Sequence, residues 1–252
     1  MPAPKSSYWS AVRAPRYSLL YALPLLAAYE GLAWAMGQTG YSGVRNGADV
    51  LLKSLFLSLG GRHGLTLFTA AVLGTGVVLV IRDVHRHGLP RARFFGGMLL
   101  ESVGYALALG TVASILTTLL LTGRLVILLA QGAGGSEMSH LAFPVQLMVS
   151  LGAGIYEELL FRVVLVSALA ALARKAFGWK PVPSGMFAAV AGALIFSGFH
   201  YVGPLGDPFQ LGSFTFRAIA GLLFSGLYLL RGFGITAWSH ALYDVFLTVA
   251  GR

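Results

Sequence analysis

The stretch Gly154-Ile155-Tyr156-Glu157-Glu158-Leu159-Leu160-Phe161-Arg162 lies inside an apolar run from Phe143 to Ala173 that is long enough to cross a bilayer. One charged residue at the centre of a membrane helix costs about 2.5–3.5 kcal/mol, and such residues usually face the protein interior and mark functional sites. Two adjacent glutamates and an arginine in this run therefore need an explanation. They are either a purely structural ion-pair cluster or a cluster that contains a reactive group.

Helical spacing gives the two glutamates different surroundings. Glu158 and Arg162 are four positions apart with the carboxylate first, so in an α-helix they share a face and can pair. Glu157 lies about 100° around such a helix from Glu158. We therefore expect Glu158 to be neutralised by Arg162 within its own helix. We expect Glu157 to face a polar cavity and to be free for chemistry.

The composition is that of an integral membrane protein. Of the 252 residues, 56% are hydrophobic and 11% are charged, and the mean hydropathy is +0.76, whereas soluble domains carry roughly 25% charged residues. The chain has no cysteine, which excludes disulfides, thiolate metal sites and a cysteine nucleophile. The basic residues flank apolar spans and form no continuous patch, so the net charge of +9 indicates membrane topology and argues against a nucleic-acid partner.

We predict an all-α fold, in which residues 1–252 form a single integral-membrane domain. It is a polytopic bundle of about seven or eight transmembrane helices plus a short interfacial helix. The apolar segments that we expect to span the membrane are residues 17–36, 65–81, 94–121, 143–173, 186–202, 214–230 and 235–250. Residues 48–59 form a helix too short to cross, which is expected to be interfacial or re-entrant. Residues 82–93 are expected to be a basic hinge, 124–131 a possible extension of the third span, and 132–140 a glycine-rich loop.

The distribution of Lys and Arg predicts the orientation of the chain. With a cytoplasmic N-terminus, the cytoplasmic side holds residues 1–16, 82–93, 174–180 and Arg231, which contain 11 of the 18 Lys and Arg residues. The positive-inside rule therefore favours a cytoplasmic N-terminus. We expect a multi-pass protein of a bacterial-type inner membrane or an equivalent lipid bilayer.

Two later spans also carry polar residues. His200 stands among apolar residues, with Phe196 one helical turn before it, while His240 and Asp244 are four apart and share a helix face. A single membrane histidine is about as often a packing hydrogen bonder as a catalytic group. The His–Asp pair alone fits a packing contact, half of a metal site or a carboxylate-oriented histidine. Together with Glu157, these residues are the set expected of a water-activating site.

Three motifs in this order resemble the signature of a known family. They are Glu157-Glu158-x-x-x-Arg162, Phe196-x-x-x-His200 and His240-x-x-x-Asp244. The family is that of the CPBP intramembrane proteases, also called CAAX protease/bacteriocin-processing or ABI, and it includes the Ras-converting CAAX endopeptidase. The resemblance covers about residues 156–245, within a catalytic region of about 143–250. It implies a membrane helix bundle that cleaves peptide bonds within or near the bilayer.

The resemblance also implies roles for single residues. Glu157 and His200 would activate a water molecule, and His240 with Asp244 would bind the oxyanion or complete the polar site. Glu158, Arg162 and Phe196 would support them. Many members have asparagine where this chain has Asp244, and an ionised aspartate cannot donate to an oxyanion. Asp244 is therefore protonated, orients His240 or ligates a metal.

Other mechanisms remain open at this point. A serine-protease mechanism is one alternative, because Ser197 and Ser239 lie beside the two histidines. Adjacent helix positions do not face each other, however, which argues against it. We expect no cofactor. Zinc is the alternative, because nitrogen and carboxylate oxygen ligands are available, although the chain has no His-Glu-x-x-His motif. The residues that would bind it are Glu157, His200, His240 and Asp244.

The expected partner is a membrane protein or a lipidated or C-terminal-tail peptide, cleaved as a CAAX-type or a sorting and processing substrate. A proton-coupled transporter is an alternative function, because acids and histidines in spans can relay protons. Transporters often show repeated halves, which this sequence lacks. A non-catalytic membrane scaffold is a third possibility, but it would leave the buried charges without a purpose.

Overall fold

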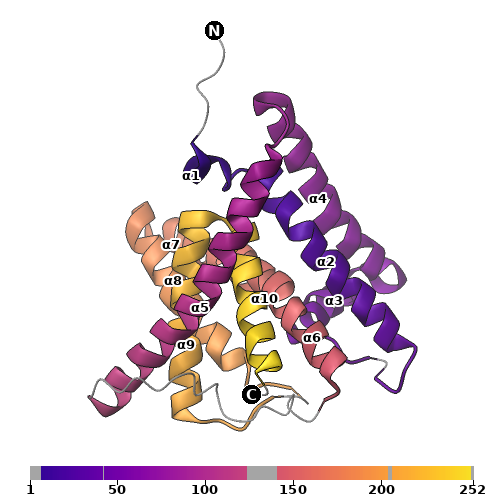
Figure 1. Cartoon of the computed structure of the whole chain (residues 1–252). Helices are drawn as coiled ribbons and strands as arrows, with labels where there is room; N and C mark the ends of the chain where they lie inside the picture. The colour runs from indigo at the N-terminus through magenta and orange to yellow at the C-terminus, as the bar shows by residue number, and fades with distance from the viewer. Residues whose placement is uncertain (1–6, 42, 124–140, 204–205, 251–252) are drawn as a thin grey trace.

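A computed structural model describes residues 7–41, 43–123, 141–203 and 206–250, and in these ranges the chain is helical and contains no strand (Figure 1). The helices are α1 (Tyr8–Ala11), α2 (Pro15–Gly37), α3 (Gly47–Gly60), the 3₁₀ turn η1 (Gly61–His63), α4 (Gly64–His87), α5 (Ala92–Thr122), α6 (Phe143–Gly152), the π-helix η3 (Ala153–Val166), α7 (Ser167–Phe177), α8 (Pro181–Phe199), α9 (Leu211–Arg231) and α10 (Phe233–Val249). The helix extension at 124–131 and the loop at 132–140 lie outside the described residues.

The structure confirms an all-α membrane helix bundle. Among the described residues, five helical segments are long and apolar enough to cross a membrane: Pro15–Gly37, Gly47–His87, Ala92–Thr122, Pro181–Phe199 and Leu211–Arg231. The two other expected spans carry the first and third polar motifs. One is the continuous helix formed by α6, η3 and α7, and the other is α10, which has 17 residues. The chain is thus an integral membrane protein.

Two predicted boundaries are wrong. The basic hinge expected at 82–93 is helical as far as His87, because cations in a last helical turn interact favourably with the helix dipole. The helix ends at Gly88, whose φ of 77° suits glycine. The fifth span begins at Pro181 rather than at residue 186, since proline fits the first turn of a helix.

The helix α10, which carries the third motif, lies in the middle of the bundle. In Figure 1, α2, α3 and α4 lie on one side, α7, α8 and α9 lie on the other, and α10 stands between them. α10 packs against α5, η3, α2, α6 and α9. Gly154 permits its close contact with η3, because a Cβ at Gly154 would collide with the carbonyl oxygen of Ala237. This approach brings the first and third motifs together.

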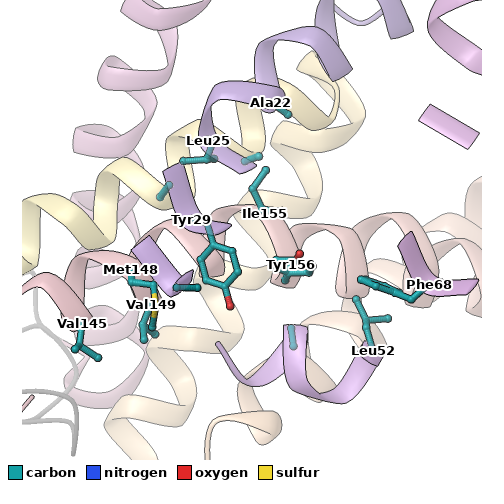
Figure 2. Close-up of a cluster of buried hydrophobic side chains, with 14 residues drawn as sticks. Ala22, Leu25, Tyr29, Leu52, Phe68, Val145, Met148, Val149, Ile155 and Tyr156 are labelled. Atoms are coloured by element: carbon teal, nitrogen blue, oxygen red, sulfur yellow. The ribbon is translucent and has the colours of Figure 1, made fainter. Parts of the chain in front are cut away.

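Buried side chains from α2, α3, α4 and the motif helix pack in one hydrophobic cluster. Figure 2 shows Tyr29 of α2 and Tyr156 of η3 next to each other, with Leu52 of α3 and Phe68 of α4 beside them. The ring centroids of Tyr29 and Tyr156 are 5.2 Å apart, and those of Phe68 and Tyr156 are 6.4 Å apart. The short helix predicted at 48–59 therefore exists as α3, and it packs against α4 and η3.

Two cations that entered the topology count are buried in ion pairs. Arg231 pairs with Glu101 of α5 at 2.8 Å, and Arg16 pairs with Asp83 of α4 at 3.4 Å. Both arginines are less than a tenth exposed. They join helices as well as marking a membrane face, and the cytoplasmic N-terminus stays a prediction.

Candidate active site

The backbone that carries the first motif differs from the α-helix assumed from the sequence. Residues 153–166 form a π-helix, with α-helix before and after it. π-Helical segments have wider i→i+5 turns and occur frequently at functional sites. The angular positions deduced from an α-helical repeat are therefore wrong in detail, although Glu158 and Arg162 still meet.

Glu158 holds two partners at once. Its Oε2 lies 3.2 Å from Nε of Arg162, which confirms the predicted ion pair, and its Oε1 lies 2.7 Å from Nδ1 of His240. Glu158 is 0% and Arg162 is 1% exposed, so this is a fully buried polar cluster. Glu158 therefore does more than neutralise a charge on its own helix: it also fixes the histidine of the third motif.

Arg162 connects the motif helix with α8 and α9. Its guanidinium lies 4.5 Å from the ring centroid of Phe196 and 5.7 Å from that of Phe224. Nη2 also donates to the carbonyl oxygen of Gly221 at 3.5 Å. The Phe224 ring stacks on His240 with centroids 4.6 Å apart. The aromatic residue of the second motif is thus a packing surface for the arginine of the first.

Glu157 is held at one oxygen only. It is 7% exposed, and its Oε1 accepts a hydrogen bond from Nδ2 of Asn46 at 2.8 Å. Its Oε2 is buried and has no hydrogen-bond partner among the described residues. Glu157 lies within electrostatic range of His200 and His240. One oxygen is thus anchored, while the other remains available for a proton.

His200 lies directly after the last residue of α8. Its Nδ1 is 2.9 Å from the carbonyl oxygen of Phe196. A carbonyl oxygen only accepts, so Nδ1 carries a proton, and in the neutral ring Nε2 is the nitrogen that can accept one. The backbone after His200 is tied down, since the His200 carbonyl accepts from the backbone N–H of Asp207 at 2.9 Å and Asp207 pairs with Arg217 of α9.

His240 lies between two carboxylates. In addition to its contact with Glu158, its Nε2 is 3.7 Å from Oδ2 of Asp244. That distance allows an ion pair but is too long for a hydrogen bond. Nε2 is therefore not blocked by Asp244, whose side chain is 27% exposed.

The serine alternative is not supported by the hydroxyl contacts. Ser197 donates to the carbonyl oxygen of Phe214 and Ser239 to that of Ile235, each at 2.7 Å. Both serines are 0% exposed. Each hydroxyl proton is used in a backbone hydrogen bond, and neither serine shows a hydrogen bond to a histidine in the described part of the chain.

The residues proposed as zinc ligands do not form a ready-made ligand set. Within the ranges that the structure describes, no group of three or more His, Asp or Glu side chains is placed to hold one metal ion. Glu157 and His240 also have one polar atom each engaged with Asn46 and Glu158. Metal independence itself stays a prediction.

Asn46 is the site residue that reasoning from the sequence missed. It precedes the first residue of α3, far from the three motifs in the chain, and it is 2% exposed. Asparagine before an apolar helix is a recognisable N-cap signal. That signal predicts the cap alone and carries no information about a contact with Glu157.

Comparison with known proteins supports the resemblance deduced from the motifs. Residues 139–246 match the family model described as type II CAAX prenyl endopeptidase Rce1-like. This range holds all three motifs and none of α1 to α5. Neither the curated proteins nor the solved structures contain a match to the chain.

Proposed function

We propose that this protein, whose residues 139–246 resemble the Rce1-like type II CAAX prenyl endopeptidases, is an intramembrane endopeptidase. Its substrate is a prenylated or otherwise membrane-associated protein or peptide, cleaved near a CAAX-type C-terminus. The observation that carries the mechanism is the state of Glu157. One of its oxygens is anchored by Asn46, and the other has no hydrogen-bond partner in the described ranges and is in electrostatic range of two histidines.

The first step of the proposed reaction is water activation. Glu157 Oε2, assisted by His200 Nε2, takes a proton from a water molecule, whose oxygen forms a bond with the scissile carbonyl carbon. A positioned general base typically contributes about 10²–10⁴-fold to such a step. The tetrahedral intermediate then collapses with cleavage of the carbon–nitrogen bond. The proton held by the Glu157–His200 pair passes to the leaving amine.

His240 is proposed to stabilise the oxyanion. Glu158 and Asp244 place negative charge on both sides of the ring, which favours the imidazolium form. In that form Nδ1 donates to Glu158, and Nε2 retains a proton that it can donate to a developing oxyanion. Asp244 then orients and charges His240, and it need not donate itself.

A prenylated fluorogenic peptide with a CAAX sequence tests this function. The detergent-purified chain is expected to cleave the peptide at one site, identified by mass spectrometry. Glu157→Gln should lower kcat about 10²–10⁴-fold, as expected for loss of a general base. Arg174→Ala, an exposed residue on α7, is the control and should retain wild-type activity.

Two outcomes would overturn the proposal. A folded wild-type chain that cleaves neither this peptide nor any protein of its own membranes, but moves protons across liposomes, would be a transporter. A Glu157→Gln variant with wild-type kcat would remove Glu157 from the mechanism. Adding a chelator to the wild-type assay distinguishes two mechanisms. Retained activity is expected if a carboxylate activates the water, and lost activity is expected if zinc does.

A further inference from the structure

We propose that Asn46, at the start of α3, is a positioning residue for Glu157: its side-chain amide fixes one carboxylate oxygen so that the other is presented to the substrate water. This inference rests on the proposed function. It assigns a role to a residue outside the three motifs and outside the family-matched range 139–246.

The direction of the Asn46 amide is set by the helix that it caps. Oδ1 of Asn46 accepts the backbone N–H of Ala48 at 2.9 Å. Because the oxygen is used as an acceptor there, the other end of the amide is the NH₂ group, which can only donate. That group lies 2.8 Å from Oε1 of Glu157. The cap of α3 thus determines that Glu157 meets a donor and not an acceptor.

The backbone of Asn46 is hydrogen-bonded as well. Its N–H donates to the hydroxyl of Tyr29 at 3.3 Å, and that hydroxyl donates to Oδ2 of Asp49 at 2.7 Å. Asp49 is 0% exposed and pairs with Arg45 at 3.2 Å and with Lys53 at 2.7 Å. The start of α3 is therefore part of a buried polar network.

The same network reaches the motif helix from a second point. Lys53 and Arg45 also pair with Glu30 of α2, and Glu30 accepts a hydrogen bond from the Tyr156 hydroxyl at 2.6 Å. Tyr156 directly precedes Glu157 in η3. These contacts therefore fix the position of α3 relative to the turn of η3 that carries the Glu157 carboxylate.

The motif helix leaves room for Asn46 at a glycine. A Cβ added to Gly152 would lie 2.7 Å from Cβ of Asn46 and 2.6 Å from Cε2 of Tyr29, closer than real Cβ atoms approach. Both contacts involve groups held in the polar network. The close approach of α3 to the helix that carries Glu157 thus depends on the absence of a side chain at residue 152.

Capping alone does not explain the arrangement. The cap uses only Oδ1, so serine or aspartate at residue 46 would satisfy it nearly as well. An ionised aspartate has no donor, and the serine hydroxyl is one atom shorter than the asparagine amide. Without the amide of Asn46, neither oxygen of Glu157 keeps a hydrogen-bond partner among the described residues, so the carboxylate is no longer held in one orientation. Positioning therefore predicts a loss in catalysis that a capping residue cannot restore.

The experiment compares Asn46→Ser and Asn46→Asp with the wild-type chain on the prenylated CAAX peptide. In Asn46→Ser we expect kcat to fall about 10- to 100-fold, the loss expected for a hydrogen bond to a charged group, with KM within about twofold. The groups that act on Glu157 include Asn46 at the start of α3, His200 after α8, His240 and Asp244 from α10, and Arg162 from its own helix. Losing the neutral donor destabilises the carboxylate relative to the acid, so the acid limb of the pH–kcat/KM profile should move to higher pH.

Stability measurements separate positioning from folding. Thermal unfolding of each variant is followed in the same detergent, and activity is compared well below its unfolding midpoint. If Asn46→Asp does not fold, Asn46→Ser alone decides. A folded Asn46→Ser with wild-type kcat and an unshifted acid limb would overturn the proposal. So would an activity loss that only follows the folded fraction. Glu157→Gln in the same assay distinguishes failure of the positioning role from failure of the proposed function. If Glu157→Gln is inactive while Asn46→Ser is fully active, the proposed function stands and the positioning role fails.

Discussion

Arg162→Ala is the perturbation that best tests how this site is held together. The substitution removes the ion-pair partner of Glu158 in a place where both residues are inaccessible to solvent. It also removes the cation that lies 4.5 Å from the ring of Phe196. Among the residues that the structure describes, His240 is then the one partner left to Glu158.

The magnitude follows from these contacts. Breaking a buried ion pair from one side costs about 3–5 kcal/mol, because a charge remains buried without compensation. The cation–π contact adds about 0.5–2 kcal/mol. Since His240 still faces Glu158, the pair contribution should lie at the lower end, and we expect a total loss of about 3.5–5 kcal/mol.

A double-mutant cycle identifies the source of this loss. Unfolding of wild type, Arg162→Ala, Glu158→Gln and the double variant is measured by heat or denaturant in one detergent. Because Gln removes the stranded charge and its carbonyl still accepts from His240, the double variant should recover about 0.5–3 kcal/mol relative to additivity. Arg174→Ala, which is exposed, should change stability by less than about 0.5 kcal/mol. Additive losses, or an Arg162→Ala variant as stable as wild type, would refute the ion-pair reasoning.

Two further predictions concern residues around the site. Gly152→Ala should destabilise the protein by about 1–3 kcal/mol through overpacking and should lower kcat. Gly185→Ala is the control, because no atom lies within 4 Å of its added Cβ, and it should change neither quantity. Thermal unfolding and the peptide assay measure both effects, and an unchanged Gly152→Ala variant would contradict the close packing of α3. Asp244→Asn should retain substantial kcat in the same assay, and chelator should leave the parent enzyme active.

The fold class and one of the site contacts were predictable from the sequence. Composition and the apolar spans define a membrane helix bundle, because hydrophobic length leaves few alternatives. The Glu158–Arg162 pair follows from a local spacing of four residues and survives the change from α- to π-helix. The π-helix itself was not predictable, since the residues of this stretch carry no signal for wider turns.

The contacts between distant helices were beyond the sequence. Asn46 and Glu157 are 111 positions apart, and no periodic pattern connects them. Glu158 was expected to be satisfied within its own helix, whereas one of its oxygens binds His240 of α10. A carboxylate has two oxygens and can serve two partners, so a correct local pair leaves the second partner undetermined.

The family resemblance implies asparagine in many members at the position of Asp244, and the contacts of Asp244 predict what that exchange would do in this chain. At 3.7 Å from Nε2 of His240, Asp244 adds negative charge beside the ring without closing a hydrogen bond to it. Glu158 supplies a second carboxylate at Nδ1. In the proposed mechanism the imidazolium of His240 therefore keeps one carboxylate partner when Asp244 is replaced by a neutral residue. Asparagine at residue 244 has the same shape and adds a donor, and the site should therefore still stabilise an oxyanion. A metal ligand would behave differently, because removing its anionic oxygen would weaken metal binding and activity together. If Asp244→Asn is inactive, and if a chelator inactivates the parent enzyme and zinc restores it, then Asp244 is a metal ligand. The proposal that Asp244 adjusts the charge of His240 would then be wrong.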